Sequence, residues 1–298
     1  MTETELLEKA LHSSASIHQP HALKAFIAAQ YLSVTLPDCD GLWLQVSELI
    51  SKSELSVTGS ISEMVEAPEF SEVRISRILS GGIYPAAYLA LAQWYERKGF
   101  EDIFAHYIAE AASHSEYLSH NVTILLALNT VYQQLTVAQT TPFLNRMTEF
   151  LTSTFERNSS VVPSNPVKAP SFSELLEVSI KQPSFFGHNL ITLAWLIRCE
   201  AMLNSEQLSK MSYHLYLQAT SPLDDPDDAL DITILNGIEL ISSEDEFHKK
   251  LSALIFDTCD NLHQVTLADA LVYLQQQFPA KTANLSLIAD YYHQWLKS

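Results

Sequence analysis

Glycine is scarce in this chain, with 7 residues among 298. The sequence holds no GxGxxG turn and no GxxxxGK[ST] loop, so neither a Rossmann nor a P-loop nucleotide site is indicated. The HExxH zinc helix and the GxSxG nucleophile elbow are missing as well. No single motif therefore names a reaction.

Positive charge is also limited. Lys and Arg number 17 against 35 Asp and Glu, which gives a formal net charge of −18 and a pI near 4.9. Such a protein repels the phosphate backbone of nucleic acids and the surface of an anionic bilayer. We therefore expect neither nucleic acid nor a membrane as a partner.

Cysteines and long apolar runs are rare. Cys39, Cys199 and Cys259 are odd in number and far apart, which favours neither a CxxC metal site nor a disulfide framework. No apolar run approaches the roughly 18 residues of a membrane span, and the start MTETELLEKALHSS is too acidic for a signal peptide. The sequence predicts a soluble, unprocessed, cytoplasmic protein.

Helical periodicity is what the chain does have. Leu, Ala, Glu, Gln and Ile recur with apolar positions three and four residues apart, and capping residues such as Ser205 and Asp227 precede several of these stretches. We predict an all-α fold in one continuous body, 1–298. The predicted helices cover residues 3–12, 20–34, 41–51, 84–98, 100–113, 116–135, 140–156, 172–181, 186–203, 205–219, 228–242, 245–258, 261–276 and 283–296.

Two stretches break this periodicity. Residues 52–83 mix β-branched residues with glycines and a proline, and residues 157–171 carry three prolines. Neither stretch is predicted to be helical. The second is a candidate hinge between two packed helical halves.

One helical stripe offers metal-ligand spacing. His106, Glu110 and His114 lie four residues apart, so a helix would place them on one face. The paired Glu-x-x-His pattern of di-iron bundles is not found, and a solvated His/Glu face explains the spacing as well. The acidic run 224–231 lacks the glycine and glutamate of an EF-hand, and we interpret it as a solvated loop and helix cap.

A histidine stands at the head of four apolar segments. SHNVTILLAL (119–128), GHNLITLAWL (187–196) and LHQVTLADAL (262–271) resemble one another and follow at steps of about 70 residues, and His21 opens a fourth segment. A histidine at a helix N-terminus tends to stay neutral and can accept a proton. If these helices pack side by side, His21, His120, His188 and His263 would line one apolar cavity suited to a flat ligand.

A second interpretation of these residues is purely structural. Each histidine could cap its helix or fill a polar gap in the core. The same choice between core and ligand contact applies to the aromatic residues Tyr84, Tyr88, Trp94 and Trp195.

Five segments keep a distinctive order along the chain. They are IHQPHALKAFIAA near the start, YPAAYLALAQWYERKGFEDIFAHYI at 84–108, SHNVTILLAL, SFFGHNLITLAWLI at 184–197 and DNLHQVTLADALVYL at 260–274. Together they resemble the questin oxidase-like family over most of the chain. The resemblance implies a helical fold and an oxidoreductase that opens an aromatic or polyketide-like ring by Baeyer–Villiger-type oxygenation. It also implies a reduced nicotinamide cofactor, NADPH.

The resemblance assigns roles to single residues. It implies catalytic roles for His120, His188 and His263, which would bind or deprotonate a phenolic or quinone group, and a substrate contact for His21. We also predict substrate contacts for the aromatic residues Tyr84 and Trp195. No metal ligand is assigned among them, and no cofactor follows from the residues themselves. The chain departs from the family pattern at Ile124, where the middle motif carries a second histidine. The alternative is therefore a non-enzymatic helical module that binds a small apolar molecule or another protein.

Overall fold

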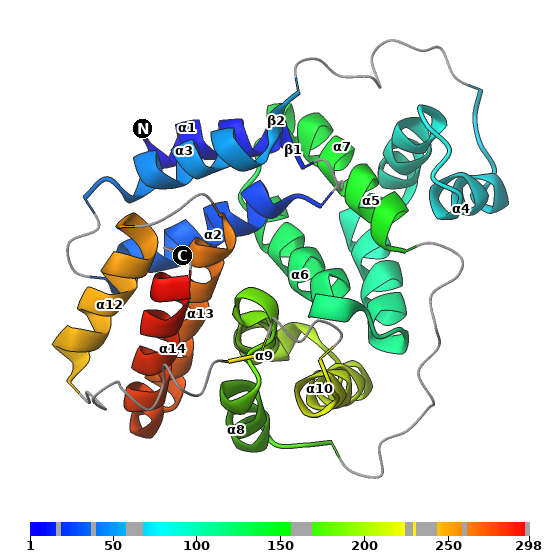
Figure 1. The fold of residues 1–298 in the computed structure, drawn as a ribbon. Helices are drawn as coiled ribbons and strands as arrows, with labels where there is room; N and C mark the ends of the chain where they lie inside the picture. Colours follow the sequence, from blue (N-terminus) through cyan, green and yellow to red (C-terminus); the bar gives the residue numbers. More distant parts are fainter. Residues whose placement is uncertain are drawn as a thin grey trace.

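A computed structural model describes residues 1–15, 19–36, 40–57, 68–155, 169–223, 229–230, 243–257 and 261–295. In these residues the fold is all-α (Figure 1), which confirms the predicted fold class. The one small sheet of the described part pairs strand β1 (Ser13–Ser14) antiparallel with β2 (Leu55–Ser56). The helices are α1 (Glu3–Leu11), α2 (His21–Thr35), α3 (Leu42–Ser53), α4 (Glu72–Ser80), α5 (Ala86–Ser113), α6 (His120–Tyr132), α7 (Val137–Thr154), α8 (Phe172–Lys181), α9 (His188–Arg198), α10 (Ser205–Thr220), α12 (Glu244–Phe256), α13 (His263–Gln277) and α14 (Thr282–Trp295).

The prediction of no helix in residues 52–83 is wrong, because α4 lies there. The Ser71 side chain accepts a hydrogen bond from the backbone N–H of Arg74 and so caps this helix. Ile75, Ile78 and Leu79 then form an apolar face that is buried in the core, and the helix packs against α5. Gly81 and Gly82 follow the helix instead of interrupting it.

Other predicted helices differ from the structure in where they begin or break. The pair 84–98 and 100–113 corresponds to α5, which is broken at Gly99, where φ is 80° and ψ is 174°. The helix predicted at 116–135 begins only at His120, because a short 3-10 turn with left-handed residues precedes it. Nearly all of the predicted helix at 228–242, of the candidate hinge at 157–171 and of the acidic run 224–231 lies outside the described residues.

Four helices form the centre of the molecule. α2 packs against α6 and α13, and α9 packs against the same two helices, so the four close a ring. Each of them is largely apolar around its whole circumference, as expected for helices enclosed by others; every residue of α6 from His120 to Leu128 is buried. Each of the four begins at a histidine, one to four residues after the start that the sequence predicts.

α2, α9 and α13 meet a second time further along. The Arg198 guanidinium at the end of α9 donates two hydrogen bonds of 2.8 Å to the Asp269 carboxylate on α13. The rings of Tyr31 on α2 and Tyr273 on α13 lie 4.0 and 4.4 Å from the guanidinium. This contact fixes the three helices relative to one another away from their histidine ends.

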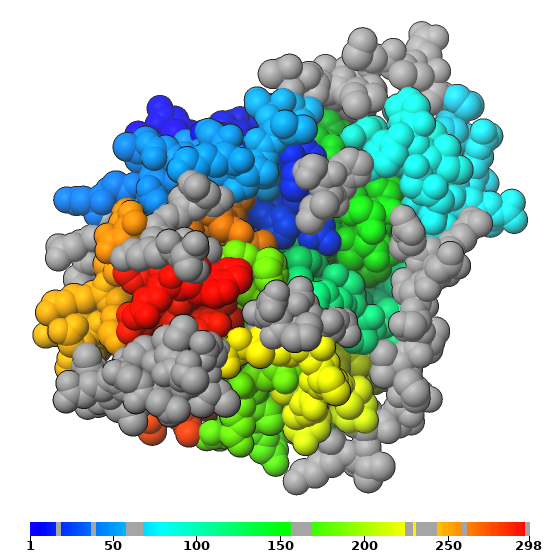
Figure 2. Space-filling view, viewed as in Figure 1, coloured from blue at the N-terminus to red at the C-terminus, as the bar shows by residue number. Residues whose placement is uncertain are grey.

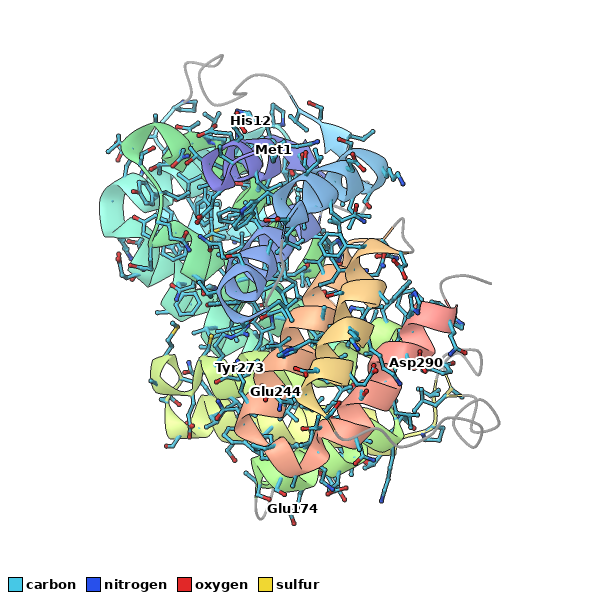
Figure 3. All side chains as sticks on the ribbon, turned by 90° about the vertical axis from the view of Figure 1, so that its left-hand side faces the viewer. Met1, His12, Glu174, Glu244, Tyr273 and Asp290 are labelled. Carbon is cyan, nitrogen blue, oxygen red and sulfur yellow. The ribbon has the colours of Figure 1, made fainter. Side chains whose placement is uncertain are left out.

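The remaining helices cover this ring. α1 and α3 pack on α2, and α5 and α7 pack on α6. α8 and α10 pack on α9. α12 and α14 form a C-terminal layer beside α13; Figure 3 shows this side, with Glu244 at the start of α12 and Asp290 on α14. In the space-filling view α14 (red) lies at the surface (Figure 2). No helix in the described ranges combines the length and apolarity needed to cross a bilayer.

Candidate functional site

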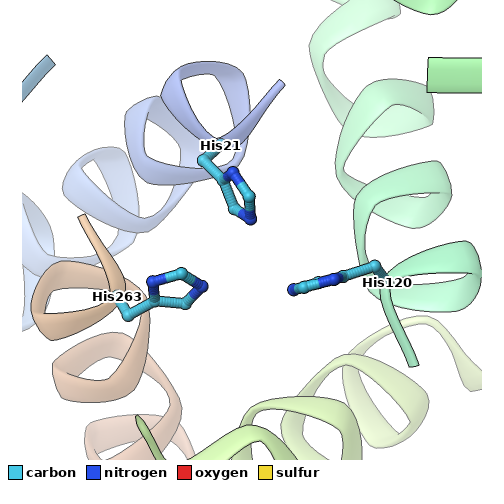
Figure 4. Close-up of side chains that lie close together, drawn as sticks. All are labelled: His21, His120 and His263. Atoms are coloured by element: carbon cyan, nitrogen blue, oxygen red, sulfur yellow. The ribbon is translucent and has the colours of Figure 1, made fainter. Parts of the chain in front are cut away.

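The four histidines at the heads of the central helices meet at one place. Figure 4 shows the rings of His21, His120 and His263 pointing toward one another from α2, α6 and α13. The ring centroids are 5.2 Å apart for His21 and His120, 4.9 Å for His120 and His188, 4.8 Å for His188 and His263, and 4.9 Å for His263 and His21. The four imidazoles thus repeat the closed ring formed by their helices. We call them the histidine centre.

The outer ring nitrogens of this centre face oxygen atoms. Nδ1 of His188 bonds the carbonyl oxygen of Phe185, and Nδ1 of His263 bonds Oδ1 of Asn261 at 2.7 Å. The His21 ring bonds the backbone of Gln19. Because these oxygens only accept hydrogen bonds, the ring nitrogens bonded to them carry the proton.

The ring nitrogens that face one another, here called the inner nitrogens, therefore carry a free lone pair in His21, His188 and His263. The Nε2 atoms of His21 and His263 are buried and have no hydrogen-bond partner. Nε2 of His120 lies 2.9 Å from Nε2 of His188. Without an ion, His120 must keep its proton on Nε2 and donate it to His188, since two lone pairs at this distance repel each other.

The spacing of the inner nitrogens suits one metal ion. One ligand nitrogen from each of His21, His120 and His263 lies within 4.8 Å of the other two. His188 is a candidate fourth ligand because its Nε2 lies next to Nε2 of His120. A metal–nitrogen bond of about 2.1 Å places two ligands about 3.0 Å apart at right angles and about 3.4 Å apart in a tetrahedron. The 2.9 Å separation of His120 Nε2 and His188 Nε2 is close to the first value, and separations near 4.8 Å would have to shorten when an ion binds.

Burial keeps the four imidazoles neutral. Desolvation, aided by nearby Lys24, lowers the pKa of His21 and of His188 from 6.5 to about 3. The pKa values of His120 and His263 are also far below 6.5, first because of desolvation and then because of His188. Neutral imidazole is the form that binds metal ions.

Glu116 stands behind His120. Its carboxylate accepts the backbone N–H of Asn121 at 2.9 Å and that of His120, and one oxygen lies 3.9 Å from Nδ1 of His120. Burial raises its pKa from 4.5 to about 7 despite these bonds. Glu54 has a similar place at α2, where it accepts the N–H of Ala22 at 2.8 Å, and burial raises its pKa to about 7. Both carboxyls thus cap helices that begin in the centre.

Two turns of the same shape aim His120 and His188. Leu118 and Ser119 have φ values of 68° and 53°, and Phe186 and Gly187 have 47° and 74°. The following asparagine in each copy, Asn121 or Asn189, donates from Nδ2 to a backbone carbonyl seven residues earlier. The repeated His-Asn pair in the sequence was the visible trace of this turn.

The predicted aromatic site residues lie elsewhere. Trp195 is buried on α9 beside Arg198, 5.5 Å from its guanidinium, two turns beyond His188. The Tyr84 hydroxyl bonds that of Thr152 at 2.5 Å, and its ring packs on Tyr88, whose hydroxyl donates to Glu149. Neither Tyr84 nor Trp195 makes a described contact with the four histidines.

His106, Glu110 and His114, which have metal-ligand spacing in the sequence, do not form a metal site in the structure. His106 lies 3.8 Å from Glu110, but Nδ1 of His114 turns to the Glu110 backbone carbonyl. In the described residues, the grouping that meets metal-ligand distances is that of His21, His120 and His263. His106 instead lines a groove of about 760 Å³ between α4 and α5, together with Trp94.

Aromatic rings close the centre on the side of α13. Phe186 stacks on His263 with centroids 5.2 Å apart, and Phe185 lies 6.0 Å from His188. Trp295 contacts both phenylalanines. Because the histidine rings already touch one another, a flat aromatic molecule does not fit between them. The sequence did not single out these phenylalanines or Asn261.

The chain was also compared with known proteins. No protein family model, curated protein or solved structure matches it.

Proposed function

We propose that His21, His120, His188 and His263 bind one transition-metal ion, and that the protein is an oxidoreductase that uses this ion on a small aromatic or polyketide-like molecule held outside the four rings. The convergence of four neutral imidazoles, whose inner nitrogens are buried and face one another, carries the metal part of the proposal. The oxidoreductase part is the reaction that the questin oxidase-like resemblance implies.

The surroundings of the ligands support a metal centre over an ordinary polar core. Metal-bound histidines usually donate their second ring N–H to an oxygen, which fixes the tautomer and the ring orientation. Phe185, Asn261 and Gln19 supply such oxygens to three of the rings. For His120, metal binding would shift the ring proton to Nδ1, where the Glu116 carboxylate lies 3.9 Å away.

The four imidazole ligands limit which metals can bind. Imidazole suits Zn, Cu, Fe and Ni, whereas Mg and Ca prefer oxygen ligands. Such an ion supplies Lewis acidity or, if it is redox-active, electron transfer when bound. The protein residues hold it, fix the imidazole tautomers and limit its contact with bulk water, since His120, His188 and the Nε2 atoms of His21 and His263 are buried.

A nicotinamide dinucleotide does not fit the described residues. They form no parallel sheet with a glycine-rich turn. Arg97 and Lys98 line the groove between α4 and α5, but they already pair with Glu69 and Glu72 at 3.3 and 2.9 Å. We therefore assign no step to NADPH.

Metal analysis of the purified chain tests the proposal. We expect about one transition-metal ion per chain, and loss of most of it in His120→Gln and His188→Gln, because a lone pair that binds the ion is removed. His106→Gln is the matched control, since His106 is exposed and outside the centre. Metal-free wild-type protein after incubation with Fe, Co, Cu, Ni and Zn salts would contradict the proposal. Oxygen consumption with hydroxylated aromatic compounds then tests the reaction.

A non-catalytic role is the second candidate. The observation that favours it is the complete burial of His188 and the close contact of the four rings, as in a closed structural metal site. Bound metal together with no oxygen uptake, and a loss of stability in proportion to metal removal, would support this role over an oxidoreductase.

A further inference from the structure

We propose that the metal ion of the histidine centre takes a small anion as an additional ligand, and that the Lys24 ammonium is the counter-charge of this anion. This inference rests on the metal centre of the proposed function and adds the class of its exogenous ligand, an anionic oxygen or nitrogen donor of a few atoms.

Lys24 is a buried amine without an acidic partner. Its side chain is 1% exposed, and it lies one helical turn after His21. Nζ donates a hydrogen bond of 3.0 Å to the hydroxyl of Thr123, which lies one turn after His120. In the described ranges no carboxylate is within ion-pair distance of Nζ. Burying a charged amine in this way is costly unless an anion comes close.

The neighbouring acids are already engaged. Asp269 is held by both guanidinium nitrogens of Arg198. Glu116 accepts the backbone N–H groups at the start of α6 and lines a cavity of about 260 Å³ on the outer side of His120. Both acids attract the Lys24 charge from a distance, but neither forms an ion pair with its Nζ.

Three sources of positive potential meet at the inner nitrogens. Four imidazole ligands are neutral, so they leave the charge of a divalent ion uncompensated. Lys24 brings its charge close to two of the rings, because it lies one turn after His21 and its Nζ bonds Thr123, one turn after His120. The positive ends of α2, α6, α9 and α13 also point into the same place, because each helix begins at its histidine.

Two geometric observations direct this potential to a ligand. The Nε2 atoms of His21 and His263 are buried without partners, which leaves them free to hold the ion. Lys24 is 1% exposed, and in the described ranges its Nζ has no carboxylate within ion-pair distance, although Glu116 and Asp269 act on its charge from further away. A bound anion would satisfy the ion and the amine together. The close contacts among the rings limit such an anion to a few atoms.

The test uses cobalt-loaded full-length protein, because the visible spectrum of cobalt reports a change of ligand. Sodium azide should change the spectrum of wild type. Lys24→Met and Lys24→Gln should bind azide more weakly by about tenfold or more with cobalt content unchanged, since they remove the counter-charge. Lys9→Met is the matched control, because Lys9 bonds Ser47 and Ser51 on α3, and it should bind azide as wild type does.

Each outcome decides the inference. Full cobalt content with no azide effect, or with equal azide affinity in wild type and both Lys24 variants, overturns it and leaves the metal centre standing. Failure of wild type to bind cobalt overturns the metal centre and this inference with it. If both Lys24 variants fail to fold, wild type alone decides. Azide should then bind and acetonitrile, its neutral counterpart of similar size, should not; equal binding of the two overturns the inference.

Discussion

The turn before His120 and the turn before His188 share the backbone of their last two residues but differ in side chains and at the residue that enters the turn, where φ is −124° at Glu116 and 65° at Ser184. Residues 117–119 read Tyr-Leu-Ser, and residues 185–187 read Phe-Phe-Gly. Both turns place their last two residues in the left-handed region, and both are followed by His-Asn. The left-handed conformation costs L-residues roughly 1–2 kcal/mol each, yet the first turn uses no glycine for it. The shape is therefore held by what surrounds it.

The asparagines supply much of that hold. Asn121 Nδ2 bonds the His114 carbonyl at 3.0 Å, and Asn189 Nδ2 bonds the Gln182 carbonyl at 2.6 Å. Each bond ties the helix start to the chain entering the turn. The turns differ in how they back the histidine ring, with Glu116 behind His120 and the Phe185 carbonyl behind His188. The two turns thus orient their histidines in the same way, but one ring has a carboxylate behind it and the other has a neutral carbonyl.

The largest expected difference in stability between the two turns comes from substitutions at their third residues, Ser119 and Gly187. A Cβ at Gly187 would lie 2.5 Å from Cδ1 of Leu267, a buried residue of α13, and φ there is 74°. Gly187→Ala should lower the free energy of unfolding by about 2–4 kcal/mol through backbone strain and overpacking. Ser119→Ala should cost only about 1 kcal/mol, because Ser119 already has a Cβ and loses only its bond to Gln218. Urea unfolding measures both, and equal losses would contradict the comparison.

The sequence predicted the helices of this site better than its turns. Apolar segments headed by histidine predict the starts of α6, α9 and α13 because periodicity is a local property. The left-handed Leu118 and Ser119 leave no such trace, since neither residue favours that conformation. Nor does local sequence reveal that the four helix starts meet, or that Trp195 lies with Arg198 instead, because both depend on packing between distant segments.

Acid should reveal the neutral histidines of both turns in the metal-free protein. Their pKa values lie below the 6.5 of an unfolded chain, at about 3 for His21 and His188. Stability is therefore complete above pH 6.5 and falls toward pH 3, as the unfolded state takes up protons that the folded state refuses. Glu54 and Glu116 oppose this between pH 7 and 4.5, because their folded pKa of about 7 favours protonation. Four histidines outnumber two acids.

The net change is measurable. From pH 6.5 to 5.5 the free energy of unfolding should fall by about 1.5–2 kcal/mol, since each uncompensated proton contributes about 1.4 kcal/mol per pH unit and the unfolded histidines are only partly protonated in this range. His120→Gln and His188→Gln should each flatten this slope by about one proton. Urea titrations across the range give the slope. A wild-type stability that is constant or rises on acidification would show that the rings are not held neutral.

The asparagine ties should be equivalent. Asn121→Ala and Asn189→Ala each remove a buried donor and strand a carbonyl, so each should cost about 1–3 kcal/mol of folding free energy. Asn129→Ala is the matched control, because Asn129 lies at the exposed end of α6 and bonds only the Met202 sulfur. Thermal unfolding compares the three variants. A neutral effect at one site alone would mean that the two turns are held in different ways.

The smallest effect concerns the serine that stands where the second turn has glycine. Ser119→Gly removes the steric cost of a left-handed residue, about 1 kcal/mol or more, but it also removes the hydrogen bond from the Ser119 hydroxyl to Gln218. The two terms oppose each other, so stability should change by less than about 1 kcal/mol. Gln218→Leu alone, measured beside Ser119→Gly, isolates the hydrogen bond. If Ser119→Gly is strongly destabilising, the serine hydroxyl, and not the packing around the turn, sets the backbone before His120. The likeness of the two turns would then have separate physical causes.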